Sequence, residues 1–381
     1  MKKTIYLKYI KQLQEKINSD NNLIQVLLGP RQVGKTTTLL KLIEEFYPKN
    51  SHYVSADKIF NSDHSWLQEQ WIFAARNEKI LIVDEIQKVH NWAEVIKSLY
   101  DESKKQKKSI KCVLLGSSSL EIQKGLSESL TGRFQLTQAY HWNYSESNEG
   151  YKLKFSDYLK FGGYPGSYNF KDQNEWADYV KNSIIATVVE KDILQYNTVK
   201  NPALFRQAFE ILTAYPAQEI SYTKLLGQLQ DKGNVEIIKY YIKLYEGAYL
   251  IKALEKYSEK KINIKSSSPK IVPLCPSLYY LNIQDDYKSD ELGRVFELAV
   301  GAQLVRTGFD LYYWRDKNNE VDYVVKKGRR IWAIEVKSGR KKSNNGLFEF
   351  KNQFKNVTCV YITQENYFEF ENDPAWFLEG L

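Results

Sequence analysis

A glycine-bounded turn between a strand pattern and a helix pattern is the feature that most constrains this fold. Residues 29–36 read GPRQVGKT, which fits the spacing G-x-x-x-x-G-K-[ST]. An apolar strand pattern over residues 24–28 precedes the turn, and a helical pattern over residues 36–46 follows it. The glycines allow the backbone to curl so that its N–H groups and the helix N-terminus face an anion. The stretch therefore predicts a phosphate-binding loop in a parallel α/β sheet.

The loop indicates a nucleotide, ATP with Mg²⁺, as the ligand. We expect Lys35 to place its charge on the β- and γ-phosphates and the Thr36 hydroxyl to bind Mg²⁺. The residues expected to contact the nucleotide are Gly29, Pro30, Arg31, Gln32, Val33, Gly34, Lys35, Thr36 and Thr37. The alternative is an ordinary glycine-rich turn with a solvated lysine, against which the flanking strand and helix patterns argue.

A pair of carboxylates follows a second buried strand pattern, residues 80–83. Ligands of open α/β sheets bind at the carboxyl ends of the strands, so we expect Asp84 to hold Mg²⁺ through water. The adjacent Glu85 is the candidate that orients or deprotonates an attacking water, which favours hydrolysis over phosphoryl transfer to a small molecule. The alternative is that the two carboxylates simply end a strand.

Two weaker signals follow in the same part of the chain. A third strand pattern ends in serines at 117–119, and we select Ser118 as the residue that would sense the γ-phosphate. A loop or helix-capping role explains such serines equally well. Arg133, beside a turn glycine, could stabilise the charge on a transferring phosphoryl group in its own subunit or in a neighbour. A surface arginine is the alternative.

Charge and composition limit the kinds of partner that the protein can bind and the cellular compartment in which we expect it. The chain has 54 Lys and Arg against 46 Asp and Glu, a net charge of +8, with basic clusters at 104–111 and 326–342. A polyanionic partner is compatible with this balance. The three cysteines lie far apart, so neither a disulfide framework nor a cysteine-based zinc site is expected. No apolar run is long enough to span a bilayer, and we expect a cytoplasmic protein that does not bind membranes.

A helix-turn-helix spacing occupies residues 219–257. Ser221 is placed to cap a first helix, residues 231–233 turn the chain, and Asn234 is placed to cap a second helix, followed by a β-prone wing. The outer face of the second helix offers Glu236, Lys239 and Lys243. This face is only modestly basic, so both DNA contact and packing against protein remain open.

The combination of motifs along the chain resembles a known family. The stretches GPRQVGKTTTLL, ILIVDEIQKVHNW, LLGSSSLEI, LTGRF, FGGYP, EVDYVV and IEVKSG are similar, in this order, to bacterial and archaeal AAA-type P-loop ATPases that carry a C-terminal domain of unknown function. The resemblance implies an α/β protein with an AAA-like ATPase core at 1–145 and a helical lid at 146–212. It further implies a winged-helix-like segment at 213–260 and a restriction-endonuclease-like α/β domain at 261–381. The chain departs from the family pattern at Lys191, where an arginine is expected, and at Cys275, where an aspartate is usual.

The C-terminal part suggests a second chemistry. Residues 320–339 predict a β-hairpin that turns near Lys327-Gly328. Counting outward from the turn sets Asp322 opposite or diagonal to Glu335, at roughly 5 to 8 Å. With Lys337, these residues match a D…E-x-K nuclease arrangement, in which Mg²⁺ activates water against a phosphodiester, and Glu297 could add a carboxylate. The alternative is a hairpin with alternating solvated charges.

Three functional hypotheses result. The first is an ATP-hydrolysing AAA-like protein that acts on or with DNA through its C-terminal modules. The second is an ATP-controlled switch that binds a protein partner. The third is a metal-dependent DNA nuclease coupled to the ATPase. A homo-oligomer fits all three, because AAA-like cores often form rings.

Overall fold

The computed structural model describes residues 7–58, 63–117, 120–194, 197–229, 234–259, 267–283, 289–339 and 345–381. The chain forms two compact units, described separately below. The first contains Met1–Tyr140 and Glu190–Asn197, and the second contains His141–Val189 and Thr198–Leu381. The first unit is therefore built from two stretches of sequence. In the described part of the chain, no helix has the length and apolar character needed to cross a membrane.

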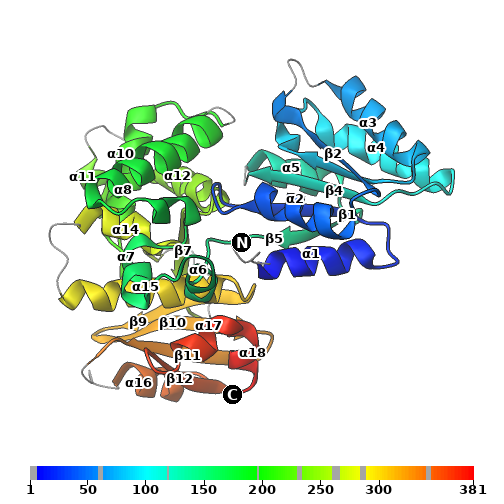
Figure 1. Ribbon diagram of the computed structural model, residues 1–381. Helices are drawn as coiled ribbons and strands as arrows, with labels where there is room; N and C mark the ends of the chain where they lie inside the picture. Colours follow the sequence, from blue (N-terminus) through cyan, green and yellow to red (C-terminus); the bar gives the residue numbers. More distant parts are fainter. Residues whose placement is uncertain are drawn as a thin grey trace. The chain divides into compact units, whose positions relative to one another are not determined.

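A five-stranded parallel sheet forms the centre of the first unit (Figure 1). Its strands, in the order β2-β3-β4-β1-β5, are β1 (Ile24–Gly29), β2 (Ser51–Ser55), β3 (Ile80–Asp84), β4 (Cys112–Ser117) and β5 (Phe134–Gln138). Every residue of β1 is buried, as expected for a parallel strand covered on both faces. The three strands predicted from apolar runs, β1, β3 and β4, are confirmed, whereas β5, whose pattern Phe-Gln-Leu-Thr-Gln is half polar, was not predicted.

Helices cover both faces of this sheet. They are α1 (Lys8–Asn18), α2 (Lys35–Phe46), α3 (His64–Arg76), α4 (Trp92–Lys105) and α5 (Leu120–Ser129), with short 3₁₀ turns at η1 (Ala56–Lys58) and η2 (Ile86–Lys88). Trp71 of α3, Ile96 of α4 and Leu126 of α5 pack with alternate residues of β1, namely Ile24, Val26 and Leu28. Helices α1 and α2 lie on the opposite side of the sheet in Figure 1. The result is a three-layer α/β arrangement.

The second unit begins with helices, as expected for residues 146–212. These are α6 (Tyr144–Tyr151), α7 (Phe155–Phe161), η3 (Pro165–Asn169), α8 (Gln173–Asp178) and α10 (Pro202–Ala214). Between α8 and α10 the helix is wound in the wide π form at η4 (Tyr179–Ile185) and η5 (Thr187–Ile193). The end of η5, from Glu190 onward, belongs to the first unit.

The helix-turn-helix prediction is confirmed in its elements. Ser221 caps α11 (Tyr222–Gln228) by accepting from the Lys224 N–H, and Asn234 caps α12 (Val235–Gly247) by accepting from the Ile237 N–H. The turn expected at 231–233 lies outside the described residues. Three short strands complete this segment: β6 (Gln218–Glu219), β7 (Ile251–Lys256) and β8 (Lys270–Pro273), with β8 antiparallel to both of the others.

A mixed seven-stranded sheet unites this segment with the C-terminal residues. Its order is β12-β11-β10-β9-β7-β8-β6. The remaining elements are α14 (Pro276–Ile283), α15 (Ser289–Val305), β9 (Asp310–Asp316), β10 (Asn319–Lys327), β11 (Arg330–Lys337), α16 (Asn345–Gln353), β12 (Val357–Thr363), α17 (Tyr367–Asn372) and α18 (Pro374–Glu379). Because β7 pairs in parallel with β9, no break in the sheet separates residues 213–260 from 261–381.

Helices pack on both faces of the C-terminal strands. On one face, Phe296 of α15 and Phe370 of α17 bury Trp332 and Ile334 of β11. On the other face, Phe350 of α16 packs with Ala333. Successive residues of β11 therefore face opposite sides of the sheet, and apolar residues are covered on both sides.

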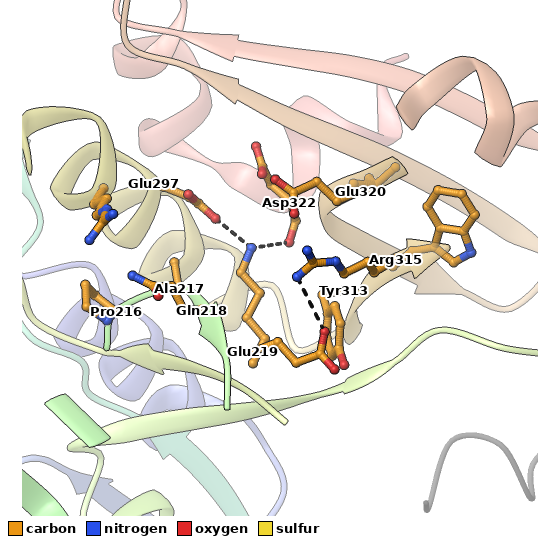
Figure 2. A pocket seen from close by; sticks show the side chains of 13 residues that line it. Pro216, Ala217, Gln218, Glu219, Glu297, Tyr313, Arg315, Glu320 and Asp322 are labelled. Atoms are coloured by element: carbon orange, nitrogen blue, oxygen red, sulfur yellow. Dashed lines mark hydrogen bonds and ion pairs between the residues drawn. The ribbon is translucent and has the colours of Figure 1, made fainter. Parts of the chain in front are cut away.

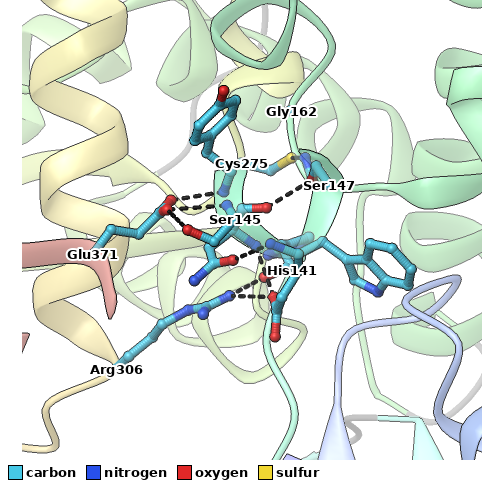
Figure 3. A network of polar contacts seen from close by, with 12 residues as sticks. His141, Ser145, Ser147, Gly162, Cys275, Arg306 and Glu371 are labelled. Atoms are coloured by element: carbon cyan, nitrogen blue, oxygen red, sulfur yellow. Dashed lines mark hydrogen bonds and ion pairs between the residues drawn. The ribbon is translucent and has the colours of Figure 1, made fainter. Parts of the chain in front are cut away.

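A polar network ties the start of α6 to the C-terminal helices within the second unit (Figure 3). The buried Glu371 carboxylate accepts hydrogen bonds from the Tyr144 N–H (2.6 Å), the Ser145 N–H (3.1 Å) and the Ser145 hydroxyl (2.8 Å). In the same network Cys275 Sγ accepts from the Gly163 N–H at 3.0 Å and lies 3.1 Å from the Ser277 hydroxyl. Cys275, which stands where the resemblance leads us to expect an aspartate, therefore makes polar contacts.

Candidate functional site

The glycine-bounded loop follows β1 and leads directly into α2. At Gly29, an added Cβ would lie 2.5 Å from the Ala139 carbonyl oxygen, which leaves no room for a side chain. Gly34 has a φ of +85°, a left-handed conformation that glycine adopts without strain, and it precedes the first turn of α2. The two glycines thus meet separate requirements, close backbone approach at one end of the loop and positive φ at the other. Gly34 makes no side-chain capping bond to α2, so the helix N-terminus is not capped by its own N-cap residue and can receive an anion.

The Lys35 side chain folds back onto the loop. Its ammonium donates hydrogen bonds to the carbonyl oxygens of Gly29 (2.9 Å) and Pro30 (2.7 Å). Burial lowers the pKa of this lysine to about 8, and the neighbouring carboxylates of Glu85 and Asp84 oppose that shift. The charge is therefore held in a poorly solvated position, where an incoming anion interacts strongly with it.

Thr36 and Asp84 come from different elements and meet at the carboxyl edge of the sheet. The Thr36 hydroxyl donates to the Asp84 carboxylate at 2.8 Å, and the Tyr53 hydroxyl donates to the same carboxylate at 2.8 Å. Asp84 is only 5% exposed. A hydroxyl and a carboxylate are ligands that suit Mg²⁺, so the two residues fit the predicted metal position. Tyr53 was not predicted, because a tyrosine within a strand carries no motif signal.

Glu85 follows Asp84 in an unusual backbone conformation. Its φ is +53°, in the left-handed region that non-glycine residues rarely occupy. Its N–H donates to Asp84 Oδ1 at 2.9 Å, and its carboxylate accepts from the Gln87 amide. Burial raises the pKa of Glu85, and the Arg31 charge opposes the shift. Such outliers persist where surrounding structure enforces them, typically at functional positions.

Arg31, within the loop, forms an ion pair with Asp192 of η5. The Asp192 residue is 6% exposed and lies in the short stretch, Glu190–Asn197, that belongs to the first unit. The contact joins residues 161 positions apart in sequence. Sequence reasoning missed this role of Asp192, although the stretch Glu190-Lys191-Asp192 stood out as a departure from the family pattern.

The other loop residues predicted to contact the nucleotide differ in exposure. Val33 is fully buried, whereas Gln32 and Thr37 are exposed. Gln32 has a φ of +61°, so the loop contains two left-handed positions. Thr38, which follows, donates to the Gly34 carbonyl at 2.7 Å and fixes the first turn of the helix.

The two weaker predictions have different outcomes. Ser118 lies outside the described residues, although β4 ends at Ser117 beside Gly29. Arg133 precedes β5, whose first residue pairs with Ile24 at the start of β1. The loop begins five residues later along β1, or roughly 16 Å at about 3.3 Å per residue. Arg133 instead donates two hydrogen bonds to Asp101, at 2.8 and 2.9 Å. This geometry does not support a role in its own subunit, and the role in a neighbour stays a prediction.

A second group of charges lines a pocket of about 270 Å³ in the second unit (Figure 2). The Lys270 ammonium donates to the Glu297 carboxylate at 2.6 Å and to the Asp322 carbonyl oxygen at 3.0 Å. Lys270 is 7% exposed, and it was not among the predicted residues. Burial raises the pKa of Glu297 to about 7, while the Lys270 charge opposes the shift.

The predicted D…E-x-K residues lie close together. The hairpin turns at Gly328, and Tyr323 faces Ile334, the pair of residues adjacent to Asp322 and Glu335. The Asp322 carboxylate accepts from the Val336 N–H at 2.7 Å, and Lys337 donates to Glu335 at 2.6 Å. Burial raises the pKa of Asp322 and raises that of Glu335 to about 6.

These carboxylates do not fit a metal centre as they stand. Among the described residues, no group of three or more His, Cys, Asp or Glu side chains is placed to hold a metal ion. Lys270 supplies a fixed positive charge beside Glu297, where a metal would require the carboxylate to be free. We therefore derive no reaction step through a metal at this position.

The outer face of α12 is exposed, as predicted. Glu236, Lys239 and Lys243 are all exposed, and Lys239 pairs with Glu236 at 3.0 Å. Lys239 also lies over the Tyr222 ring, at 5.5 Å from its centroid. The single acid on this face thus partly neutralises its basic character.

Comparisons with known proteins divide the chain into three matched segments. Residues 21–148 match the family model described as an AAA domain. Residues 152–285 match a domain of unknown function (DUF8612), and residues 292–377 match a second domain of unknown function (DUF4143). An uncharacterised protein of Methanocaldococcus jannaschii is 27% identical over 334 residues, which are 80% of this chain and 72% of that protein.

Solved structures give more distant likenesses. Orc1 of Aeropyrum pernix in complex with DNA is 9% identical, with a TM-score of 0.31 over 74% of this chain and 93% of that chain. A variant of Thermotoga maritima RuvB is 16% identical, with a TM-score of 0.32 over 64% and 88%. Cdc6p of Pyrobaculum aerophilum is 11% identical, with a TM-score of 0.30 over 77% and 92%. With scores this low, the fold rests on the topology of the chain itself and on the sequence matches. The chain thus carries an N-terminal AAA-type P-loop ATPase domain followed by two domains of unknown function.

Proposed function

We propose that the first unit binds ATP with Mg²⁺ and hydrolyses it. The observation that carries this proposal is the 2.8 Å hydrogen bond between Thr36 and Asp84, directly beside the half-buried Lys35 side chain. A hydroxyl, a carboxylate and a lysine from a loop and a neighbouring strand converge where the N-terminus of α2 is open. Ordinary glycine turns do not assemble this set.

The residues divide the chemical work between them. Thr36 and Asp84 would hold Mg²⁺, which neutralises charge on the β- and γ-phosphate oxygens when bound. Lys35 exchanges its bonds to the loop carbonyls for bonds to phosphate oxygens. The Glu85 carboxylate accepts a proton from water as the water oxygen attacks the γ-phosphorus. The bond from that phosphorus to the bridging oxygen breaks, and ADP leaves with the electron pair.

Nucleotide binding and phosphate release test this proposal. We expect Lys35→Ala to lose ATP binding by at least tenfold, because the anion loses its counter-charge. Glu85→Gln should keep binding and reduce turnover by 10²-fold or more, since the amide cannot accept the proton. Lys41→Ala, an exposed lysine of the same helix, is the matched control and should behave as wild type. Equal ATP affinity in wild type and Lys35→Ala would contradict the site.

We further propose DNA as the partner of the second unit. Support comes from the basic hairpin end at Lys326, Lys327, Arg329 and Arg330. The element order from α10 to β8 is that of a winged-helix-like segment, with α12 in the position of a recognition helix. The other possibility is an ATP-controlled switch for a protein partner. A nuclease-insensitive pull-down that recovers one protein stoichiometrically would favour it over DNA.

The nuclease-like alternative has mixed support. The register that brings Asp322, Glu335 and Lys337 together favours it, and the Lys270 charge beside Glu297 opposes it. Incubation of plasmid DNA with the protein and Mg²⁺ or Mn²⁺ tests whether the protein cuts DNA. Cutting by wild type that is lost in both Asp322→Ala and Lys337→Ala would establish the activity, and equal results from all three proteins would reject it.

A further inference from the structure

The ion pair between Arg31 and Asp192 connects the phosphate loop to a helix from much later in the chain. Arg31 lies between the two glycines of the loop, at a position that wraps the phosphates when a nucleotide is bound. Asp192 is 6% exposed, and buried carboxylates are rarely tolerated without a cationic partner. The pair therefore stabilises the position of η5 beside the loop.

Asp192 is part of a compact group of charges. The charges of Lys35, Glu85 and Arg31 all act on one another, and those of Arg31 and Lys35 act on Asp192. Burial raises the pKa of Asp192, and Arg31 is the main group that opposes the rise. Three cations, Arg31, Lys35 and Lys88, thus face four carboxylates, those of Asp57, Asp84, Glu85 and Asp192. An incoming triphosphate adds negative charge to a group that already has an excess of it.

The helix that delivers Asp192 has an uncommon geometry. From Tyr179 to Ile185 and again from Thr187 to Ile193 it is wound in the π form. π-helical turns are rare, usually single, and concentrated at functional positions. Two such segments in succession, the second of which contains the residue paired with the phosphate loop, indicate a helix whose winding is maintained by its contacts. Breaking the ion pair removes one of those contacts.

A bound triphosphate competes with Asp192 for the Arg31 guanidinium. A guanidinium binds phosphate oxygens with two parallel hydrogen bonds, and phosphate offers more charge than a carboxylate. If Arg31 turns to the phosphates, Asp192 stays behind as a buried carboxylate next to added negative charge. The docked position of η5 is then disfavoured, so binding of nucleotide and docking of η5 oppose each other.

We propose that Asp192 is a nucleotide-responsive partner of Arg31, which holds η5 docked until ATP draws the arginine away. The inference rests on the proposed ATP binding and adds to it the element that responds. Because η5 continues without interruption from η4, its release reaches residues of the second unit through the helix backbone. Asp192 is a positioning residue, which acts on the nucleotide through Arg31.

Affinity for a non-hydrolysable ATP analogue is the first test. In Asp192→Asn the neutral amide keeps the shape but no longer competes for Arg31, so we expect binding to tighten by about 5- to 10-fold. Asp178→Asn is the matched control, since it makes the same change on an exposed residue of the same helix, and its affinity should equal that of wild type. Equal or weaker binding by Asp192→Asn would overturn the proposal.

Hydrogen–deuterium exchange of residues 187–194 is the second test, on the full chain. In wild type, the analogue should increase exchange in this segment severalfold, and Asp192→Asn should show the increase without nucleotide. Unchanged exchange in wild type at saturating analogue would overturn the inference while leaving ATP binding intact. Failure of wild type to bind the analogue at all would overturn the proposed function as well, so the two failures are distinguishable.

Discussion

Gly162 ends α7 with a φ of +67°, and an added Cβ would lie 2.5 Å from the Cys275 sulfur. Conformation and space therefore both require glycine at this position. We expect Gly162→Ala to lower the free energy of unfolding by about 2 kcal/mol or more, because the strained φ and the clash add together. Denaturant unfolding followed by circular dichroism measures the change.

Gly227 supplies the control at the same scale. It lies in α11 with open space around its Cα and no left-handed φ. Gly227→Ala should therefore raise the free energy of unfolding by roughly 0.5–1 kcal/mol, since alanine loses less backbone entropy on folding. A Gly162→Ala protein as stable as Gly227→Ala would show that the α7 terminus relaxes freely.

Individual residues differ in how far the sequence could predict them. Lys35, Thr36 and Asp84 follow from the sequence because local geometry fixes them, the loop by its glycines and the aspartate by the end of a strand. Asp192 and Lys270 do not, because each meets its partner only after distant segments pack. Their types, an aspartate within a helix and a lysine in a short strand, carry no local signal. Polar contacts formed by tertiary packing are the part that one sequence leaves open.

At the scale of elements, strand ends and registers are the most predictable. The hairpin of β10 and β11 is fixed by its two-residue turn, and counting from that turn placed Asp322 opposite or diagonal to Glu335. The sequence did not reveal the irregularity between Val321 and Val324 in the pairing of β10 with β9. Such bulges redirect side chains, here at the strand that carries Asp322. Nor did it reveal β5, whose half-polar pattern does not alternate clearly.

The ion pair between Glu297 of α15 and Lys270 of β8 predicts that the stability of the protein depends on pH. Burial raises the pKa of Glu297 to about 7, so the native state binds more protons than the unfolded chain between roughly pH 4.5 and 7. The raised pKa of Glu297 therefore makes its full contribution to the free energy of unfolding below about pH 4.5. This contribution is lost as the pH rises through 7. The melting temperature of the wild type should therefore fall as the pH rises from 5 to 7.5.

Glu297→Gln is the variant that tests this dependence. The amide does not titrate, so the fall in stability over the same pH range should shrink by roughly 1–3 kcal/mol. In the wild type, burial lowers the pKa of Lys270, but the Glu297 and Asp322 charges outweigh this effect and raise it. An identical pH profile in wild type and Glu297→Gln would assign the dependence to other groups.

At the scale of the whole molecule, the proposed DNA partner predicts binding that depends on salt. Removing one side chain that binds a phosphate should reduce the slope of log affinity against log salt by about 1. We expect Lys326→Ala with Arg329→Ala to lower that slope by about 1–2, measured by fluorescence anisotropy with duplex DNA. Lys8→Ala with Lys41→Ala, an equal change of charge on exposed residues of the first unit, should leave the slope unchanged. Salt-independent binding, or no binding at low salt, would rule out this partner.

The two-part composition of the first unit has a consequence for how such a gene can be rearranged. Residues 190–197 complete a unit whose other residues end at Tyr140. If a gene were divided after the stretch that matches the AAA domain, the N-terminal product would contain Arg31 without its acidic partner. The C-terminal product would contain Asp192 without its cationic partner. Chimaeras that exchange C-terminal halves between relatives must also keep these eight residues matched to the loop. We therefore expect the two halves to be inherited together, and coupled substitutions at positions 31 and 192 among relatives would show it.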